Sequence, residues 1–282
     1  MEKKSGNMSF NFLEIPTRSK KPRSQGLTIV IDGLESGFLS LRELENLMEV
    51  AADYIDFMKV GWLTATLQPK DFVKSKNKIC RENDIYVFPG GMLLEWALTR
   101  GKIEQFFKEC KELGFTAIEV SDSVITLSID QKIKLIKMAK NFDFKVLAEV
   151  GKKFPETPYS SVHVINEINK LLDAGAFKVI LESEEVELLF TKNKEKAETY
   201  TKTLLEIASA VDPKDIIFEV PYGKSYTELC PILHWFISHF GSEVNLANIE
   251  PNHVVALETL RRGLDVLGFG RIISLEGQST DY

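Results

Sequence analysis

The sequence predicts an α/β protein folded as a single (β/α)8 TIM-type barrel, and three observations indicate this class. Short apolar runs rich in β-branched residues recur about every 30 residues along the chain. Segments with helical spacing of apolar residues lie between these runs, and several runs are apolar on both faces. Alternating strands and helices favour a parallel sheet that helices cover. An open, doubly wound sheet is the alternative arrangement of the same elements.

Eight strands can be placed in chain order. They are expected to begin near Thr28, Tyr54, Ile85, Phe115, Lys145, Phe177, Ile216 and Glu243. The runs 29–31, 145–148, 179–181 and 216–218 are almost entirely apolar, as strands buried on both faces require. Eight strand–helix units within residues 27–264 suit a closed barrel better than an open sheet.

The intervening helices carry recognisable boundary signals. Ser40 with Glu43 and Ser128 with Gln131 have the spacing of a capping box, in which each side chain satisfies an amide of the first helical turn. Glycines that can adopt a positive φ stand where helices should end, at Gly114, Gly175, Gly241 and Gly263. Each predicted helix therefore has a defined start or end.

The chain reads as one domain with two short extensions. No linker or low-complexity stretch interrupts the barrel region 27–264, and residues 265–282 form a glycine-containing C-terminal tail. The N-terminal extension 1–26 carries six basic and two acidic residues, and we expect a solvated, only partly ordered terminus. The remainder is strongly acidic, since the whole chain has a net charge of −6, so nucleic acid is excluded as a partner.

Composition excludes several other classes. With 44% hydrophobic and 27% charged residues, the chain is neither disordered nor fibrous. It has no apolar run long enough for a membrane span and no signal-peptide pattern at its N-terminus, so we expect a cytoplasmic protein without a membrane partner. Cys80, Cys110 and Cys230 form no metal-binding or disulfide pattern and are expected to be buried.

Polar residues follow nearly every predicted strand. In chain order they are Asp32, Lys59, Gly90 and Gly91, Glu119 with Ser121 and Asp122, Glu149 with Lys152 and Lys153, Glu182, Glu219, and Asn245 with Asn248. The carboxyl ends of the strands meet at one mouth of a barrel, where the reacting groups of such enzymes lie. Unrelated surface charges at strand ends are the alternative interpretation.

So many carboxylates in one mouth require compensation. They would raise one another's pKa and repel an anionic substrate, and the lysines offset only part of this charge. A divalent cation with oxygen ligands resolves the conflict, and Mg²⁺ suits an open site lined by carboxylates. Softer metals are disfavoured because all four histidines, His163, His234, His239 and His253, fall in predicted helices.

Two features indicate a phosphorylated ligand. Gly90 and Gly91 would let backbone amides approach an oxyanion closely. The segment 248–251 leads into a helix that starts with proline, at the usual phosphate position of such barrels. Arg261 and Arg262 lie further along that helix, and we expect them on the outer surface or at a neighbouring subunit of a homo-oligomer.

Five segments resemble the phosphosulfolactate synthase family, and the similarity runs from about residue 26 to residue 264. They are YIDFMKVGW at 54–62, GF followed by EVSD within 114–122, EVGKK at 149–153, VNLANI at 244–249 and LETLRRGL at 257–264. The resemblance implies a (β/α)8 barrel that adds sulfite to phosphoenolpyruvate with Mg²⁺, through an enediolate. The product, 2-phospho-3-sulfolactate, is a precursor of coenzyme M or of sulfolactate.

The resemblance also implies roles for residues. Lys153 is the expected general acid and Lys59 the anchor of phosphate or sulfonate, whereas strand alternation turns Lys152, the third lysine of the catalytic set, toward the helices. Glu119, Glu149 and Glu182 are the metal candidates. The expected substrate-binding residues are Asp32, Gly90, Gly91, Ser121, Glu219, Asn245 and Asn248.

The chain departs from the family pattern in several loops. Residues 181–187 keep Glu-Ser but lack the family's preceding arginine, Ser123 replaces a usual glycine, and residues 61–65 and 32–35 also differ. Two alternatives to the synthase therefore remain open. One is a barrel enzyme that acts on another phosphorylated or carboxylated anion, and the other is a non-catalytic relative of the heat-stress-associated plant branch.

Overall fold

A computed structural model describes residues 8–33, 37–152, 160–182 and 194–266, together with residues 186 and 189. Its strands are β1 (Thr28–Asp32), β2 (Phe57–Val60), β3 (Tyr86–Pro89), β4 (Ala117–Val120), β5 (Lys145–Val150), β6 (Lys178–Leu181), β7 (Ile216–Glu219) and β8 (Leu246–Ile249). Its α-helices are α1 (Leu41–Ala51), α2 (Lys70–Glu82), α3 (Gly91–Thr99), α4 (Ile103–Glu112), α5 (Ile129–Asn141), α6 (Ser161–Asp173), α8 (Lys194–Ala210), α9 (Tyr226–Phe240) and α10 (Val254–Arg261). Short 3-10 turns are η1 (Ala52–Tyr54), η2 (Thr64–Leu67), η3 (Pro213–Asp215) and η4 (Pro251–His253).

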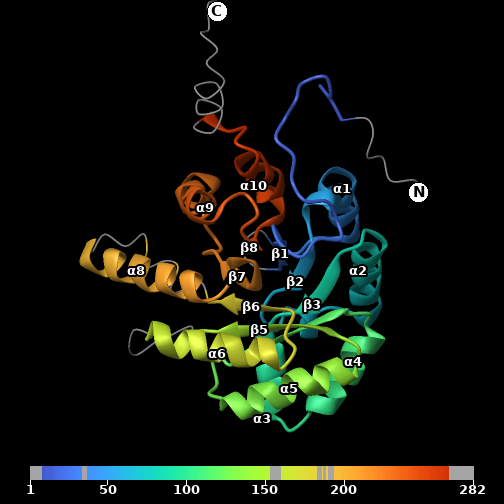
Figure 1. The fold of residues 1–282 in the computed structure, drawn as a ribbon. Coiled ribbons are helices and arrows are strands. Elements are labelled where there is room, and N and C mark those ends of the chain that lie inside the picture. The colour runs from blue at the N-terminus through green and yellow to red at the C-terminus, as the bar shows by residue number, and fades with distance from the viewer. Residues whose placement is uncertain are drawn as a thin grey trace, which may run out of the picture.

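The eight strands form one parallel sheet that curves into a barrel, with the helices around it (Figure 1). The strand order is β3-β2-β1-β8-β7-β6-β5-β4, and each neighbouring pair in this order runs parallel. The ring closes between β3 and β4, where Thr116 N donates to Val87 O at 2.9 Å. The predicted (β/α)8 barrel is thus confirmed, with two helices, α3 and α4, between these two strands.

Alternation along the strands separates two layers of core. Apolar side chains that face the barrel axis form the inner layer: Leu27, Ile29, Phe57, Phe88, Ala117, Leu147, Ile180, Ile217 and Ala247. The neighbouring positions, such as Val30 and Ile118, pack outward against the helices. Because the register between neighbouring strands is fixed, inward positions two residues further along meet at the carboxyl end of the barrel.

The predicted helix boundaries are present. Both capping boxes form, Ser40 with Glu43 before α1 and Ser128 with Gln131 before α5. Gly114, Gly175, Gly241 and Gly263 all have positive φ, as residues that end a helix require. Among the described helices, none is both long enough and apolar enough to cross a membrane. Cys80 and Cys110 are buried, whereas Cys230 is half-buried, which corrects the expectation for that residue.

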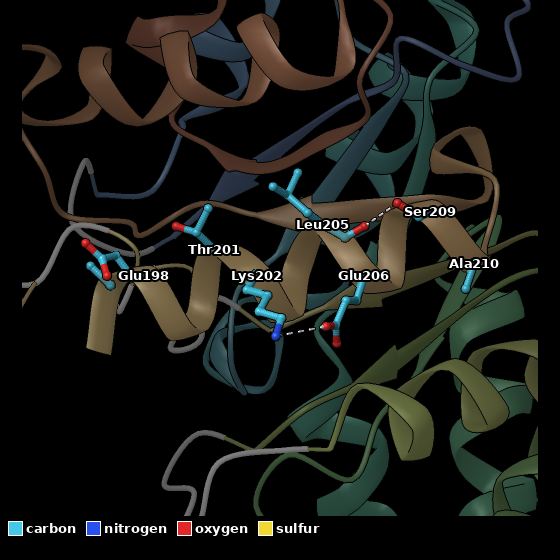
Figure 2. A pocket seen from close by; sticks show the side chains of 8 residues that line it. Glu198, Thr201, Lys202, Leu205, Glu206, Ser209 and Ala210 are labelled. Carbon is cyan, nitrogen blue, oxygen red and sulfur yellow. Dashed lines mark hydrogen bonds and ion pairs between the residues drawn. The ribbon is translucent and has the colours of Figure 1, made fainter. Parts of the chain in front are cut away.

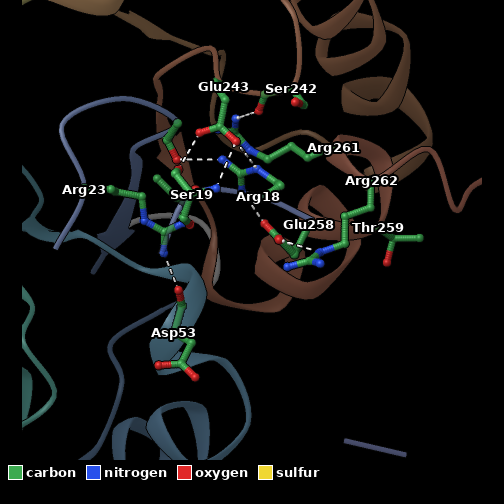
Figure 3. Close-up of polar contacts among 12 residues, drawn as sticks. Arg18, Ser19, Arg23, Asp53, Ser242, Glu243, Glu258, Thr259, Arg261 and Arg262 are labelled. Atoms are coloured by element: carbon green, nitrogen blue, oxygen red, sulfur yellow. Dashed lines mark hydrogen bonds and ion pairs between the residues drawn. The ribbon is translucent and has the colours of Figure 1, made fainter. Parts of the chain in front are cut away.

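The basic N-terminal segment lies against the amino end of the barrel (Figure 3). Arg18 pairs with Glu243 and Glu258, Arg23 Nε lies 2.9 Å from Asp56 Oδ1, and Lys21 Nζ donates to two main-chain carbonyls at 3.0 Å each. Arg18, Lys21 and Arg23 are therefore bound to the barrel rather than solvated, within an extension that we expect to be only partly ordered. Burial lowers the pKa of Lys21 to about 8, although Asp56 opposes this.

Arg261, the last residue of α10, also departs from expectation, whereas Arg262 directly after it is partly exposed. Arg261 is buried, and its guanidinium donates to Ser242 O and Val244 O at 2.6 Å each, so it does not lie on the outer surface. Burial and the nearby Arg18 lower its pKa to about 9. Arg262 Nη1 donates to Pro16 O at 2.9 Å. Of the predicted C-terminal tail, only residues 265 and 266 are described.

Candidate active site

Four ionisable side chains meet at the carboxyl end of the barrel. Lys59 on β2, Glu119 on β4, Glu149 on β5 and Glu219 on β7 each stand two residues after an inner-core residue, so alternation turns all four toward the axis. All four are buried. They line one cavity, here called the mouth cavity, together with Ile31, Trp62, Gly90, Gly91, Met92, Ser123, Tyr222 and Asn248.

Lys59 lies between two of the carboxylates. Its Nζ is 2.9 Å from Glu119 Oε1 and 2.7 Å from Glu219 Oε1. Burial alone would lower the pKa of Lys59, but the surrounding carboxylates outweigh it and raise that pKa well above its usual value. The amine is therefore a fixed positive charge in the mouth cavity at any physiological pH.

The carboxylates outnumber this single amine. Ligand oxygens of Glu119, Glu149 and Glu219 all lie within 4.8 Å of one another. Burial raises the pKa of Glu119, although Lys59 opposes it. Burial, followed by the charges of Glu182 and Glu119, raises the pKa of Glu149 well above its usual value. Counting the described residues, the three carboxylates thus form a site short of positive charge.

Two buried oxygens in the mouth cavity, Glu149 Oε1 and Asn248 Oδ1, have no hydrogen-bond partner among the described residues. Asn248 has φ 61°, and the β1–β8 register shifts beside it, which interrupts the alternation of β8 and turns the amide toward the mouth. Carboxylate and amide oxygens are the ligands that Mg²⁺ prefers. The donor set therefore fits the divalent cation that the sequence indicates.

Glu182, one of the three predicted metal ligands, lies beside this cluster. It is buried, but its carboxylate is not among the three that lie within 4.8 Å of one another. It borders Gly151, where a Cβ would come within 2.5 Å of Glu182 Cβ, and it lines a second cavity with Tyr200 of α8. Glu219, expected to bind substrate, takes its place in the cluster.

Three predicted site residues lie elsewhere. Asp32 points outward from β1 and pairs with Lys76 of α2, because Ile29 and Ile31 occupy the inward positions. Asn245 precedes β8 at the amino end of the barrel, where its Nδ2 donates to Ile216 O at 2.8 Å and its Oδ1 accepts from Leu27 N at 3.0 Å. The prediction that these two residues line the mouth is wrong.

Lys152 also serves the fold rather than the mouth cavity. Its Nζ donates to Asp122 Oδ2 and to Ile125 O at 2.7 Å each, so the amine is committed to the segment after β4. The amine therefore does not line the mouth cavity, in agreement with the orientation that alternation predicts, and a catalytic role of Lys152 stays a prediction. Lys153, the expected general acid, lies outside the described residues.

The glycines and Ser121 adjoin the site in specific ways. Gly90 and Gly91 line the mouth cavity, but Gly91 N donates to Glu119 Oε2. Ser121 Oγ donates to Glu95 at 2.5 Å. At the predicted phosphate position before α10, the carboxylate of Glu250 accepts from Gly223 N at 3.0 Å. This bond joins the segment before α10 to the segment after β7, and the phosphate position stays a prediction.

Sequence reasoning missed three residues near the mouth. Trp62, with φ 49°, makes an edge-to-face contact with Tyr222, and both rings line the mouth cavity. Glu95 is buried beneath the segment after β4. For Glu95 a signal existed, since it is the one ionisable residue in the apolar helix GMLLEWALT.

A larger, open hollow lies along α8, away from these groups (Figure 2). Within the helix, Lys202 Nζ is 3.9 Å from Glu206 Oε1 and Ser209 Oγ donates to Leu205 O at 2.7 Å. Glu206 Oε2 also accepts from Ser161 Oγ of α6 at 2.8 Å. The residues that line it do not form a cluster suited to chemistry. The three clustered carboxylates and Lys59 lie in the mouth cavity instead.

The fold and the site define a (β/α)8 barrel with an acidic, lysine-containing mouth. The family model of (2R)-phospho-3-sulfolactate synthase (ComA) matches residues 16–266. Phosphosulfolactate synthase of Methanocaldococcus jannaschii is 41% identical over 254 residues, covering 88% of this chain and 95% of that protein. The synthase of Bacillus subtilis is 35% identical, covering 89% and 95%. The chain therefore belongs to the phosphosulfolactate synthase family.

More distant similarities extend beyond the synthases. The Arabidopsis thaliana protein HEAT-STRESS-ASSOCIATED 32 is 23% identical over 278 residues, covering 89% of this chain and 91% of that one. The carboxyl transferase domain of Rhizobium etli pyruvate carboxylase superposes with a TM-score of 0.55 at 11% identity, over 83% of this chain and 41% of that one. At this identity the second similarity shows the barrel fold alone.

Proposed function

We propose that this chain is a Mg²⁺-dependent phosphosulfolactate synthase, which adds sulfite to phosphoenolpyruvate to form 2-phospho-3-sulfolactate. Family membership supports the reaction. The observation that carries the proposal is the buried cluster of Lys59, Glu119, Glu149 and Glu219 in one cavity at the catalytic end of a barrel. Small anionic substrates fit a mouth with a fixed amine and a site for a cation.

The atoms balance as follows. The sulfur lone pair of sulfite attacks the methylene carbon of phosphoenolpyruvate and forms the carbon–sulfur bond. The electron pair of the double bond moves into the substrate carboxylate as an enediolate, and a proton is then delivered to the carbon that carries the phosphate. Mg²⁺, when bound, supplies positive charge against the charge that develops on the carboxylate.

The residues of this chain then have separate tasks. Glu119, Glu149 and Glu219, with the Asn248 amide oxygen, would hold the cation. Carboxylates that turn toward a cation release the Lys59 amine, which is placed to bind the phosphate or carboxylate of the substrate. Lys153 delivers the proton in this scheme; that role rests on the family resemblance.

Purified protein with millimolar phosphoenolpyruvate, sulfite and Mg²⁺ should form the sulfonated product, followed by phosphorus NMR and mass spectrometry. Lys153→Ala should abolish turnover, and Lys59→Met should lower kcat/KM by about one to two decades, the value of a charged hydrogen bond. Lys108→Ala, an exposed lysine of α4, is the matched control.

A cooperatively folded protein that gives no product would overturn the proposal. Turnover of other enol phosphates or 2-oxo acids without sulfite would point to a different barrel enzyme. A fold that is intact but binds no Mg²⁺ would indicate a non-catalytic relative.

A further inference from the structure

We propose that Glu95 of α3 is a positioning residue, which holds the segment 121–125 against the first turn of α3 so that Ser123 and Gly91 line the mouth cavity together. The claim about geometry stands on contacts in the structure. The claim about turnover rests on the proposed function.

The Glu95 carboxylate is surrounded by donors from one short segment. Its Oε1 accepts from Ser121 Oγ at 2.5 Å, from Ser123 N at 3.0 Å and from Ser123 Oγ at 3.1 Å. Its Oε2 accepts from Val124 N at 3.0 Å and from Ile125 N at 2.8 Å. Three consecutive amides and two hydroxyls thus converge on one side chain.

No positive charge shares this task. Glu95 is 2% exposed, and within the described part of the chain neither a lysine nor an arginine pairs with it. A buried carboxylate without a counter-ion is strongly unfavourable unless hydrogen-bond donors replace its hydration. The five donors must therefore stay in place together, which restricts the segment 121–125 to one conformation.

The opposite side of the segment is held by amines. Lys152 Nζ donates to Ile125 O and to Asp122 Oδ2 at 2.7 Å each, and Lys132 Nζ lies 2.6 Å from Asp122 Oδ1. Amides of the segment therefore face a carboxylate of α3, while two of its carbonyls, Asp122 O and Ile125 O, face an amine. This arrangement fixes the segment from both sides.

The held segment touches the mouth cavity directly. Ser123 lines it, and Ser121 packs so closely on Gly91 that a Cβ there would lie 2.3 Å from Ser121 Oγ. Gly91 N in turn donates to Glu119. A displaced segment would therefore move Ser123 and disturb the contact between α3 and a carboxylate of the cluster, and small displacements in active sites cost much rate.

Glu95→Gln tests this by hydrogen exchange and kinetics together. The change keeps the side-chain shape but removes the charge and turns an NH₂ group toward amide donors. We expect the amides of Ser123, Val124 and Ile125 to exchange at least about tenfold faster. We also expect kcat to fall about 10- to 100-fold while the KM for phosphoenolpyruvate changes less than about threefold.

Glu104→Gln, an exposed carboxylate on α4, is the matched control and should leave exchange and kinetics unchanged. Unchanged exchange in a folded Glu95→Gln protein overturns the geometry. Faster exchange with kcat within twofold of wild type overturns the role in turnover. If wild type has no synthase activity, the proposed function fails while the exchange result still decides the geometry.

Should Glu95→Gln fail to fold cooperatively, Ser121→Ala takes its place. It removes one of the five donors and leaves the amides intact. A few-fold rise in exchange at Ser123 together with a lower kcat supports the proposal, and wild-type values of both overturn it.

Discussion

Glu149 is a carboxylate whose ionised form the fold disfavours. Its Oε1 is buried without a partner in the part of the chain that the structure describes, and burial together with Glu182 and Glu119 raises its pKa well above the usual value. The folded state therefore holds this proton more tightly than the unfolded chain does. Linkage then requires that stability falls as pH rises from the ordinary carboxyl range toward the raised pKa.

Glu149→Gln should remove that penalty. We expect the free energy of unfolding at pH 8 to rise by about 1–3 kcal/mol, with little change at pH 4, while synthase activity is lost. Urea unfolding at the two pH values measures this, and Glu104→Gln serves as the exposed control. A variant less stable than wild type at pH 8 would show that ionised Glu149 is compensated in the folded protein.

Single side chains were predictable where strand alternation alone decides their direction. Lys59, Glu119 and Glu149 converge because each follows an inner-core residue by two positions. Asn245 was misplaced because it precedes β8 by one residue, which moves it to the opposite end of the barrel. The lone charge in an apolar helix marks Glu95, but its partners were not predictable, because they come from a segment about 28 residues away that only the packing of α3 brings near.

At the scale of elements, the N-terminal segment shows what composition cannot reveal. Its basic residues indicate a solvated terminus, yet Arg18 reaches Glu243 and Glu258, which follow it by more than 200 residues. The helix caps, by contrast, were predictable because their donors and acceptors lie within three residues. Local signals in the sequence thus fix ends of helices, whereas the contacts of an extension depend on the whole fold.

Arg18→Ala should destabilise the barrel although it lies far from the mouth. The side chain is 1% exposed, and its removal leaves Glu243 without its arginine, with the hydrogen bonds from Ser19 remaining, and leaves Glu258 with Arg262. We expect a loss of about 3 kcal/mol in the free energy of unfolding, with kcat unchanged in the folded fraction. Denaturant titration measures the loss, with the exposed Lys20→Ala as control. Equal denaturation midpoints for Arg18→Ala and Lys20→Ala would show that the ion pairs of Arg18 do not stabilise the barrel.

At the scale of the molecule, the barrel was predictable because eight similar units repeat, and each carries its own pattern. The presence of two helices, α3 and α4, between β3 and β4 was not predictable, because the repeating pattern indicates one helix after each strand. The distribution of charge follows from the closure of the ring. Strand ends that are distant in sequence bring three carboxylates and one amine into a single cavity, so the binding of one cation there is coupled to the stability of the whole fold.

Mg²⁺ should therefore stabilise the entire barrel. A cation that binds only the folded state, at a concentration 100-fold above its Kd, adds about 2.7 kcal/mol to the free energy of unfolding. For a chain of this size that raises Tm by roughly 5–10 °C, and EDTA should reverse the shift. The shift should grow from pH 6 to pH 8, because the raised pKa of Glu149 means that a proton must leave before the carboxylate can bind. Thermal scans of wild type, Glu119→Gln and the control Glu104→Gln measure it. A Tm shift that survives in Glu119→Gln would place the cation outside this cluster. A wild-type protein that shows no Tm shift at about 10 mM Mg²⁺ would remove the cation from the mechanism.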